Sequence, residues 1–324
     1  DTDFFVKRFL ALEAWKKPFL PKDTNGYRMV HADADGLPGL VIDRYDDVFV
    51  FQIHTLGMEQ FRSQIIEALK KAFQPKAIVE RSDIEARTRE GLTVLPVKVH
   101  EGAVKEPIAF TECGITYLVD VIGGQKTGFY LDQRTTRMKA LDLCRGKRVL
   151  NLFGYTGSVS VCAAKAGAEK IVTVEVSESS LHLAIKNFER NSVNPDQHEF
   201  VQANVFDFLN SEHAEKGKFD CIVCDPPAFA KTDDKIKEAL KAYTSLNRKC
   251  LQLLEPGGIL ITSSCSGRIL NEDFLNALRI AAGSAKKDVV ILDFFNQPFD
   301  HTQRLCFPEG KYLKTAILEI TVIS

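Results

Sequence analysis

The stretch Phe219–Phe229 reads FDCIVCDPPAF, and the rest of the chain is organised around it. Its first part, Cys221–Cys224, is a short apolar run that is partly β-branched, which predicts a buried strand. Asp225 then falls at the carboxyl end of that strand, where open α/β sheets bind their ligands. The two prolines that follow cannot continue the strand and fix the backbone beyond it. A rigid carboxylate followed by an aromatic side chain suits the binding of a flat polar ring by its edge and its face.

The sequence around this stretch alternates between short apolar runs and amphipathic segments from Arg148 onward. Strands are expected at seven ranges, namely 148–152, 170–174, 199–202, 221–224, 258–263, 289–295 and 314–323. Helices are expected between them, chiefly at 158–166, 178–191, 233–254 and 271–282. Strands that alternate with helices of this length predict an α/β domain with a doubly wound, Rossmann-like and mostly parallel seven-stranded sheet.

The first hundred residues have a different pattern. Phe5, Phe9, Leu12 and Trp15 recur at helical spacing, which predicts a helix over 4–17. A second helix is expected at 58–73, and strands are expected at 28–32, 40–45, 48–53, 77–81 and 93–99. Because 324 residues exceed one ordinary domain, we expect two. They are a smaller α+β domain at 1–108 and a larger domain at 109–324 that begins with a β-hairpin over 110–119.

Composition narrows the class of protein. Apolar residues make up 45% and charged residues 26%, which are values of a globular protein. No stretch approaches the roughly 18 consecutive apolar residues of a membrane span, so no membrane partner is expected. Eight cysteines without disulfide-like spacing favour a reducing compartment, the cytoplasm. Cys221 and Cys224 lie three apart in a strand and so point to opposite faces, which favours burial over a metal site.

One basic stretch stands out from a nearly neutral chain of net charge −1. Between residues 126 and 148 the sequence has seven basic residues and only two acidic ones. A solvated surface is the simpler interpretation, and a local phosphate-binding patch on the path of an RNA is the alternative. The basic residues are Lys126, Arg134, Arg137, Lys139, Arg145, Lys147 and Arg148.

A cofactor loop is expected after the strand at 148–152, where the sequence VLNLFGYTG runs from 149 to 157. Glu175 ends the next strand, 21 residues after Gly154, and an acidic side chain there accepts hydrogen bonds from ribose hydroxyls. The dinucleotide pattern GxGxxG is absent, and no basic residue in the loop could meet a pyrophosphate. We therefore expect S-adenosylmethionine, which has ribose and adenine but no phosphate. Asn204 is either an acceptor for the adenine amino group or a helix cap.

Cys265 is the candidate nucleophile. It follows the fifth predicted strand in the segment Ser263–Ser266. In a parallel sheet this strand and the one that ends before Asp225 are expected to be neighbours. A free cysteine is most often a small hydrophobic residue. Beside a carboxylate, an aromatic ring and a methyl donor, a reactive thiol is the better interpretation.

Taken together, these motifs resemble the RlmI-type ribosomal RNA large-subunit cytosine-5 methyltransferases, and the resemblance covers nearly the whole chain. It rests on six segments, namely ADGLPGL at 34–40, GFYLDQR at 128–134, NLFGYTG at 151–157, DPPAF at 225–229, SSCS at 263–266 and FPEGKYLK at 307–314. The resemblance implies a class I methyltransferase fold preceded by a smaller central domain with a role in RNA binding. It also implies an N-terminal PUA domain, an RNA-binding module that would end where this chain begins.

The resemblance also assigns roles to residues. Cys265 is implied as the nucleophile and Asp225 as the residue that contacts the base, with Pro226, Pro227 and Phe229 beside it. Cofactor contacts are implied for Tyr130, Gln133, Arg134, Phe153, Gly154, Tyr155, Thr156, Gly157, Glu175, Val176, Asn204, Val205 and Asp225. Two positions depart from related sequences. Ala203 and Asn204 stand where many relatives carry acidic residues, and Ala228 stands where many RNA cytosine-5 methyltransferases have a second cysteine.

The activity implied is methylation of cytosine C5 in large-subunit ribosomal RNA, by an enzyme that is expected to form a homodimer. A thiolate that adds to C6 makes C5 nucleophilic, and Asp225 would hydrogen-bond cytosine N3. One alternative is an RNA purine N-methyltransferase, which uses an Asp-Pro-Pro-aromatic motif without a covalent step. Another is a non-catalytic RNA-binding scaffold that retains the fold.

Overall fold

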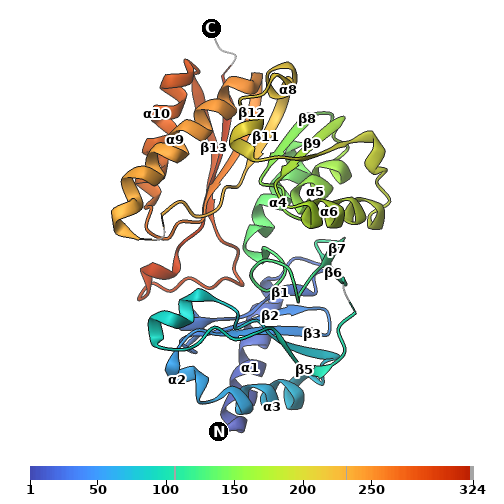
Figure 1. Cartoon of the computed structure of the whole chain (residues 1–324), viewed down its shortest axis with the longest axis vertical. Coiled ribbons are helices and arrows are strands. Elements are labelled where there is room, and N and C mark those ends of the chain that lie inside the picture. Colours follow the sequence, from blue (N-terminus) through green and yellow to red (C-terminus); the bar gives the residue numbers. More distant parts are fainter. Residues whose placement is uncertain (106, 231, 322–324) are drawn as a thin grey trace. The chain divides into compact units, whose positions relative to one another are not determined.

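The computed structural model describes residues 1–105, 107–230 and 232–321. Its internal contacts divide the chain into two compact units (Figure 1). The first unit comprises Asp1–Arg134 and Pro298–Gly310, and the second comprises residues 135–297 together with the chain from Lys311 onward. The boundary predicted from the sequence lies at residue 108, before the hairpin. By contacts the hairpin belongs to the first unit, because Asn25 and Thr111 exchange hydrogen bonds, with backbone N to backbone O at 2.9 Å and Thr111 N to Asn25 Oδ1 at 2.6 Å.

The first unit has an α+β fold, with helices packed against a five-stranded sheet. Its five-stranded sheet has the order β1-β2-β3-β4-β5, in which only β3 and β4 are parallel. The strands are β1 (Gly26–His31), β2 (Leu40–Tyr45), β3 (Val48–Ile53), β4 (Ala77–Glu80) and β5 (Lys98–Gly102), and the hairpin is β6 (Ile108–Glu112) and β7 (Ile115–Val119). The helices are α1 (Thr2–Lys16), α2 (Leu56–Glu59) and α3 (Arg62–Phe73). The predicted helical stripe of α1 buries Phe5, Phe9 and Leu12 in a core shared with α3 and the sheet.

Two predictions in the first unit are wrong in detail. The helix expected at 58–73 is two helices, because Phe61 leaves the helical conformation with φ −105° and its ring packs 5.8 Å from that of Phe5. The strand expected at 93–99 begins only at Lys98. Pro96 lies inside the expected range and has no N–H to donate to a ladder, so pairing with β4 starts after it.

The second unit is the expected α/β domain. Its seven-stranded sheet has the order β10-β9-β8-β11-β12-β14-β13. Strands β8 to β12 are parallel to one another, and β14 is antiparallel to both β12 and β13. The strands are β8 (Arg148–Leu152), β9 (Lys170–Glu175), β10 (Glu199–Gln202), β11 (Phe219–Cys224), β12 (Leu254–Ser264), β13 (Val289–Asn296) and β14 (Lys314–Ile320). The mostly parallel, Rossmann-like sheet predicted from the alternation is confirmed.

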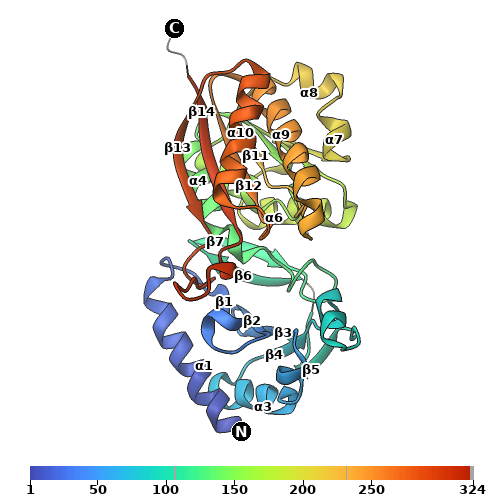
Figure 2. The ribbon, with the colours of Figure 1, turned by 90° about the vertical axis from the view of Figure 1, so that its left-hand side faces the viewer.

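Helices cover the second sheet in the manner of a doubly wound fold. They are α4 (Arg134–Leu143), α5 (Ser158–Ala166), α6 (Glu178–Arg190), α7 (Val205–Phe208), α8 (Glu212–Lys216), α9 (Ile236–Leu253) and α10 (Asn271–Ala285). Helices α9 and α10 run side by side (Figure 2), and their buried face shares a core with alternate residues of β8, β11 and β12. Strand residues two apart share a face, so the intervening residues face the opposite layer.

The two cysteines of β11 illustrate that alternation. Cys221 Sγ lies 3.8 Å from Cys144 Sγ, which follows α4, whereas Cys224 interacts with Cys250 of α9. Both side chains are fully buried, which confirms the prediction of burial. The Cys144 contact and burial raise the pKa of Cys221 well above its ordinary value, and burial raises that of Cys224. These thiols therefore pack in the sheet as neutral groups.

Two kinds of feature are absent from the residues that the structure describes. No helix among them is both long enough and apolar enough to cross a membrane. No group of three or more His, Cys, Asp or Glu side chains among them is arranged to hold a metal ion.

Candidate active site

Five neighbouring strands of the second sheet end at one edge, and a predicted site residue stands at or just after the end of each. In the order β10, β9, β8, β11 and β12, these residues are Asn204, Glu175, Phe153, Asp225 and Cys265. Parallel strands present their carboxyl ends on the same side, and open α/β sheets bind ligands there. The expected neighbour relation of the strands before Asp225 and Cys265 is confirmed, since β11 pairs directly with β12.

The loop after β8 has a backbone of left-handed conformation. Phe153, Tyr155 and Gly157 have φ angles of 59°, 45° and 71°. A side chain at Gly157 would also collide with α6, because an added Cβ would lie 2.7 Å from the Cβ of Ala184. Glycine is the residue that tolerates both conditions. The loop therefore turns tightly into α5 with its backbone open toward the strand ends.

Contacts with β9 and α6 hold the middle of this loop in place. A Cβ on Gly154 would lie 2.5 Å from Cγ2 of Thr173, so the loop backbone rests against β9. The side chain of Asn187 donates from Nδ2 to the carbonyl oxygen of Thr156 at 2.9 Å. The Thr156 hydroxyl is buried and, among the described residues, has no hydrogen-bond partner. These contacts hold the loop backbone in one conformation without a ligand.

Glu175 ends β9 and faces this loop. One carboxylate oxygen accepts from Tyr155 N at 2.9 Å, and the other accepts from Val176 N at 2.9 Å and Ser177 N at 3.0 Å. The residue is 8% exposed. A carboxylate offers about four acceptor positions, so the three hydrogen bonds to backbone leave room for a further donor such as a ribose hydroxyl.

An exposed apolar group borders the same edge of the sheet. Val176 is 64% exposed and Phe206 is 41% exposed. The centroid of the Phe206 ring lies 6.3 Å from those of both Phe153 and Phe229. Phe206 was not selected from the sequence, although an aromatic residue two positions after Asn204 was a usable signal. These aromatic faces could stack on a flat ring.

Asn204 and Val205 have structural roles that the sequence could not separate from cofactor binding. The side chain of Asn204 caps α7, because Oδ1 accepts from Phe206 N at 2.9 Å. The helix-cap alternative is therefore confirmed as a contact. Val205 is 4% exposed and packs in the core, so its side chain is not displayed at the edge.

The loop after β11 is held by contacts on both sides. Pro226 is buried and Pro227 is exposed, while the Phe229 ring packs 4.8 Å from that of Tyr243. Ser266 joins this loop to the one after β12. Its hydroxyl lies 3.1 Å from the Tyr243 hydroxyl and accepts from Ala230 N at 3.4 Å. From the sequence, Ser266 was part of the motif at 263–266 without a role of its own, and Tyr243 was not identified.

Cys265 lies directly beside the Asp-Pro-Pro segment. Its Sγ is 3.8 Å from the carbonyl oxygen of Pro226, and its side chain is partly exposed. Cys221 and Cys224, in contrast, are fully buried within the neighbouring strand. A partly exposed thiol between two site loops can meet a substrate, and a buried one cannot.

Three predicted cofactor residues lie in the first unit instead. The hydroxyl of Tyr130 donates to Gln125, and its ring faces Lys126 Nζ at 4.2 Å. Gln133 is 5% exposed, and the guanidinium of Arg134 is engaged by Glu112, Asp300 and the carbonyl of Gly26 at 2.7–3.1 Å. These contacts lie within the first unit, so a cofactor role for the three stays a prediction.

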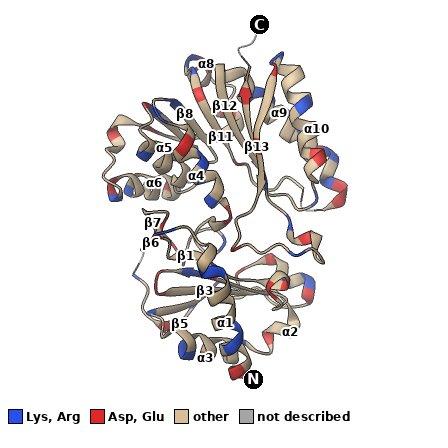
Figure 3. Cartoon of the chain, turned by 180° about the vertical axis from the view of Figure 1, so that it is seen from behind, with Lys and Arg blue, Asp and Glu red and all other residues tan. Residues whose placement is uncertain are grey.

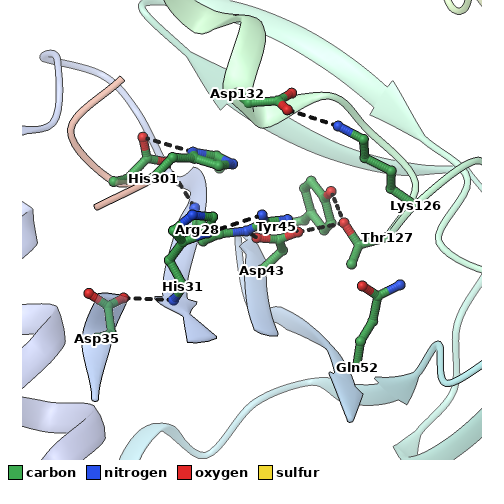
Figure 4. Close-up of polar contacts among 12 residues, drawn as sticks. Arg28, His31, Asp35, Asp43, Tyr45, Gln52, Lys126, Thr127, Asp132 and His301 are labelled. Atoms are coloured by element: carbon green, nitrogen blue, oxygen red, sulfur yellow. Dashed lines mark hydrogen bonds and ion pairs between the residues drawn. The ribbon is translucent and has the colours of Figure 1, made fainter. Parts of the chain in front are cut away.

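A network of polar residues lies within the first unit beside the segment at 126–132 (Figure 4). Arg28 binds Asp43 through two hydrogen bonds of 2.8 Å, and Thr127 donates to the same carboxylate at 2.6 Å. Thr127 also contacts the Tyr45 hydroxyl at 2.9 Å, while Lys126 pairs with Asp132 at 2.8 Å. The network anchors the segment at 126–132 to strands β1 and β2.

The basic stretch at 126–148 is not one continuous surface. Arg134 and Arg137 are 2% and 1% exposed, so these two are not available to border an RNA path. Three others are ion-paired, namely Lys126 with Asp132, Lys139 with Asp293 and Arg148 with Asp220. Basic and acidic residues are also interspersed along α10 in Figure 3. Arg145 and Lys147 remain as exposed or partly exposed candidates.

Comparison with known proteins agrees with this geometry. Residues 96–297 match the family model described as S-adenosylmethionine-dependent methyltransferase. The chain is 40% identical over 321 residues to the ribosomal RNA large subunit methyltransferase I of Shewanella frigidimarina, covering 99% of this chain and 81% of that protein. It is 41% identical over 321 residues to the protein of the same name from Photobacterium profundum, covering 97% and 79%.

A solved structure matches nearly the whole chain. It is a crystal structure of a protein described as a methyltransferase complexed with SAH, with a TM-score of 0.86 and 28% sequence identity. The match covers 99% of this chain and 82% of that chain. Both units therefore have counterparts in one solved protein.

Proposed function

The chain belongs to the ribosomal RNA large subunit methyltransferase I family of S-adenosylmethionine-dependent methyltransferases, and from this premise we propose that it forms 5-methylcytosine in large-subunit ribosomal RNA through Cys265. One observation carries this proposal. The partly exposed Cys265 Sγ lies 3.8 Å from the backbone of the Asp-Pro-Pro segment, so a thiol and a carboxylate stand at the ends of adjacent strands.

The residues at the edge of the sheet fit the cofactor of this family. Glu175 has acceptor capacity for the ribose hydroxyls, and the loop at 153–157 presents its backbone. Phe206 and Val176 expose apolar surface for the adenine. When bound, the cofactor supplies a methyl group on a positively charged sulfur. Asn204 is a weaker candidate for the adenine edge, because its oxygen already caps α7.

The chain's own groups would prepare the cytosine for methylation. The Cys265 thiolate adds to C6, and the electron pair of the C5–C6 double bond moves toward C5 and the N3–O2 system. Asp225, in its protonated form, donates to N3 and stabilises the charge that develops there. C5 then takes the methyl group. A base removes the C5 proton, the double bond forms again, and Cys265 leaves as a thiolate. The target base must be unstacked to reach this site.

An RNA purine N-methyltransferase is the main alternative, and Cys265 distinguishes the two. An N-methyltransferase positions an amine and needs no thiol. RNA that contains 5-fluorocytosine cannot release a proton from C5, so elimination stalls after methylation. The wild-type enzyme should then form a covalent RNA–protein adduct that survives denaturation and maps to Cys265. Cys265→Ala should lose both the adduct and methylation while it binds the cofactor normally.

Cys224→Ala is the matched control. Its thiol is fully buried on the neighbouring strand, so this variant should retain the adduct. If Cys265→Ala still methylates RNA, the covalent mechanism is wrong and the purine N-methyltransferase becomes the better proposal. If the wild-type protein binds no cofactor in a calorimetric titration, the non-catalytic scaffold gains support.

We further propose that exposed and partly exposed basic residues on and just after α4 contact RNA. Each phosphate contact that is removed should flatten the salt dependence of binding to single-stranded RNA by about 0.7 in the log–log slope. The test compares two sets of three Lys or Arg→Gln changes. They are Lys139, Arg145 and Lys147 near α4, and Lys237, Lys241 and Lys249 on α9. Equal slopes for both sets would mean that the stretch near α4 is only a solvated surface.

Cytoplasmic location is proposed from the thiols and the substrate. All eight cysteines lie in the described residues and none forms a disulfide, and a chain with this many reduced thiols suits a reducing compartment. Ribosomal RNA as substrate points to the same compartment. If the protein recovered from fractionated cells already contains disulfides, the proposal of a cytoplasmic location is wrong.

A homodimer is proposed through the free edge of the second sheet. Strand β13 ends the sheet, and Val290, Ile291 and Leu292 are 42%, 56% and 48% exposed. A groove of about 710 Å³ between β13 and α10 adjoins them. An antiparallel pairing of two copies centred on Val290 would place Lys287 opposite Asp293 twice, which is a self-complementary charge pattern.

The mass in solution tests this edge. Ile291→Lys should convert a dimer to a monomer in light scattering, because it places a charge on the strand edge. Ile280→Lys is the control, since this isoleucine is 48% exposed on α10. A wild-type protein that is monomeric at micromolar concentration would refute the dimer.

A further inference from the structure

Lys314 lies beside the end of β12, the strand that Cys265 directly follows. It is the first residue of β14 and stands opposite Ser264, the last residue of β12, in the antiparallel register. Its side chain is 1% exposed. A lysine is therefore buried directly beside the loop that begins with the thiol.

The ammonium group of Lys314 holds that loop at two points. Nζ donates to the carbonyl oxygens of Ser266 at 2.7 Å and Ile269 at 2.5 Å. The hydroxyl of the same Ser266 accepts from Ala230 N and contacts Tyr243. Lys314 thus fixes the segment after Cys265 and, through Ser266, the segment after Asp225.

The charge on Lys314 is held differently from that of the other fully buried lysine, Lys16. Lysines are almost never fully buried unless they are paired. Lys16, which is also fully buried, donates to the carboxylate of Asp35 at 2.6 Å. Among the described residues, no carboxylate forms an ion pair with Lys314, whose hydrogen bonds go to backbone carbonyls. Its positive charge is therefore available to complement an anion formed nearby.

Cys265, at the start of the loop that Lys314 holds, is the candidate for that anion. Burial lowers the pKa of Lys314 to about 8, and the largest opposing influence is the negative charge of Cys265. Asp273 also raises this pKa, and Lys311 lowers it. An attraction between two groups is mutual, so an ammonium that is favoured by a thiolate favours that thiolate equally.

We propose that Lys314 is the positioning residue of the nucleophile: its ammonium holds the loop at 265–270 and supplies the positive charge that favours the Cys265 thiolate. This role presupposes the function proposed above for Cys265. A lysine that only fixed the loop would leave the acidity of the thiol unchanged, and this difference can be measured without RNA or cofactor.

The first experiment follows alkylation of Cys265 by iodoacetamide between pH 5.5 and 9.5, read for each cysteine by peptide mass spectrometry. In Lys314→Gln, the midpoint of the Cys265 profile should rise by about one pH unit, and its rate at pH 7 should fall about tenfold. Lys314→Arg keeps the charge and should keep the wild-type midpoint. Lys286→Gln, at an exposed lysine just after α10, is the control and should keep the wild-type midpoint. The exposed Cys306 is an internal reference whose rate should not change.

A second measurement needs no change at Lys314. The titration of its side chain is followed by NMR in isotopically labelled protein, with Cys265 intact and with Cys265→Ser. Cys265→Ser removes the thiolate and should lower the titration midpoint of Lys314. The size of this shift should equal the rise of the Cys265 midpoint in Lys314→Gln. Variants are compared only where circular dichroism shows native folding.

The outcomes separate this inference from the proposed function. An unchanged Cys265 profile in folded Lys314→Gln, or an unchanged Lys314 titration in Cys265→Ser, would show that the lysine only fixes the loop. If the wild-type protein forms no adduct with 5-fluorocytosine RNA, C5 methylation is refuted. If Lys314→Gln still raises the Cys265 midpoint in that case, the coupling between lysine and thiolate stands. Both midpoints shifted by similar amounts would establish the role of Lys314.

Discussion

Replacing Glu175 with alanine should weaken binding of S-adenosylmethionine without unfolding the protein. The substitution removes the carboxylate that ends β9 and faces the loop at 153–157. It removes the proposed acceptor for a ribose hydroxyl. It also removes the acceptor of the Tyr155, Val176 and Ser177 N–H groups.

The magnitude follows from these contacts. A hydrogen bond to a charged acceptor contributes about 1.5–3 kcal/mol, and a neutral one about 0.5–1.5 kcal/mol. Loss of one ribose contact, with some loosening of the loop, gives about 1–3 kcal/mol of binding free energy. Since 1.4 kcal/mol is tenfold in affinity, Kd should rise by about 5- to 150-fold.

Isothermal titration calorimetry measures this change directly. Glu178→Ala makes the same change of charge three residues later, at an exposed position in the first turn of α6, and should leave Kd unaltered. The melting temperature of each variant shows whether the loop has lost order in the free protein. A Kd for folded Glu175→Ala equal to that of wild type would mean that the cofactor does not contact this carboxylate.

Three further predictions concern stability. Asp300 is a fully buried carboxylate paired with Arg134, so Asp300→Asn should lower the free energy of unfolding by about 3–5 kcal/mol. Urea unfolding followed by Trp15 fluorescence measures this loss. Asp293→Asn, at a partly exposed ion pair, should lower the free energy of unfolding by at most about 1 kcal/mol. Gly157→Ala should lower Tm more than Gly146→Ala, because both have positive φ but only Gly157 also lacks room; equal losses would contradict the close contact. Acidification from pH 7 to 5 should destabilise the first unit by up to roughly 2 kcal/mol per buried histidine, because the unfolded state takes up protons below about pH 6.5 and the folded state does not. Burial lowers the pKa of three such histidines, namely His31 (to about 2), His54 (to about 4) and His301; unfolding measured at both pH values checks this, and equal stability would refute it.

Local pattern was enough to predict the second sheet and the centre of the site. Apolar runs of strand length, separated by helices, identified β8 to β13 to within a few residues. The parallel arrangement then required Asp225 and Cys265 to stand at the same edge, because parallel strands end on one side. These inferences need only short-range periodicity and one topological rule.

The tertiary structure alone decided the contacts between distant parts of the chain. Asp300 joins the first unit through Arg134, 166 residues away, and its backbone oxygen accepts from Lys16, 284 residues away. No local signal marked residues 298–310 as part of that unit. Such pairs form because burying one charged side chain requires another buried partner, and any part of the chain can supply it.

The residues of the candidate site fall into two groups, those that local sequence identified and one that only the strand pairing revealed. Cys265, Asp225 and Glu175 were found from sequence, because each follows a strand that its own neighbours in the chain define. Lys314 was seen only as part of a motif, since its relation to Cys265 depends on β14 pairing antiparallel to β12. Strand order and direction are set by burial of the whole sheet rather than by local propensity, so the sequence determined which residues end strands and the fold determined which of them meet.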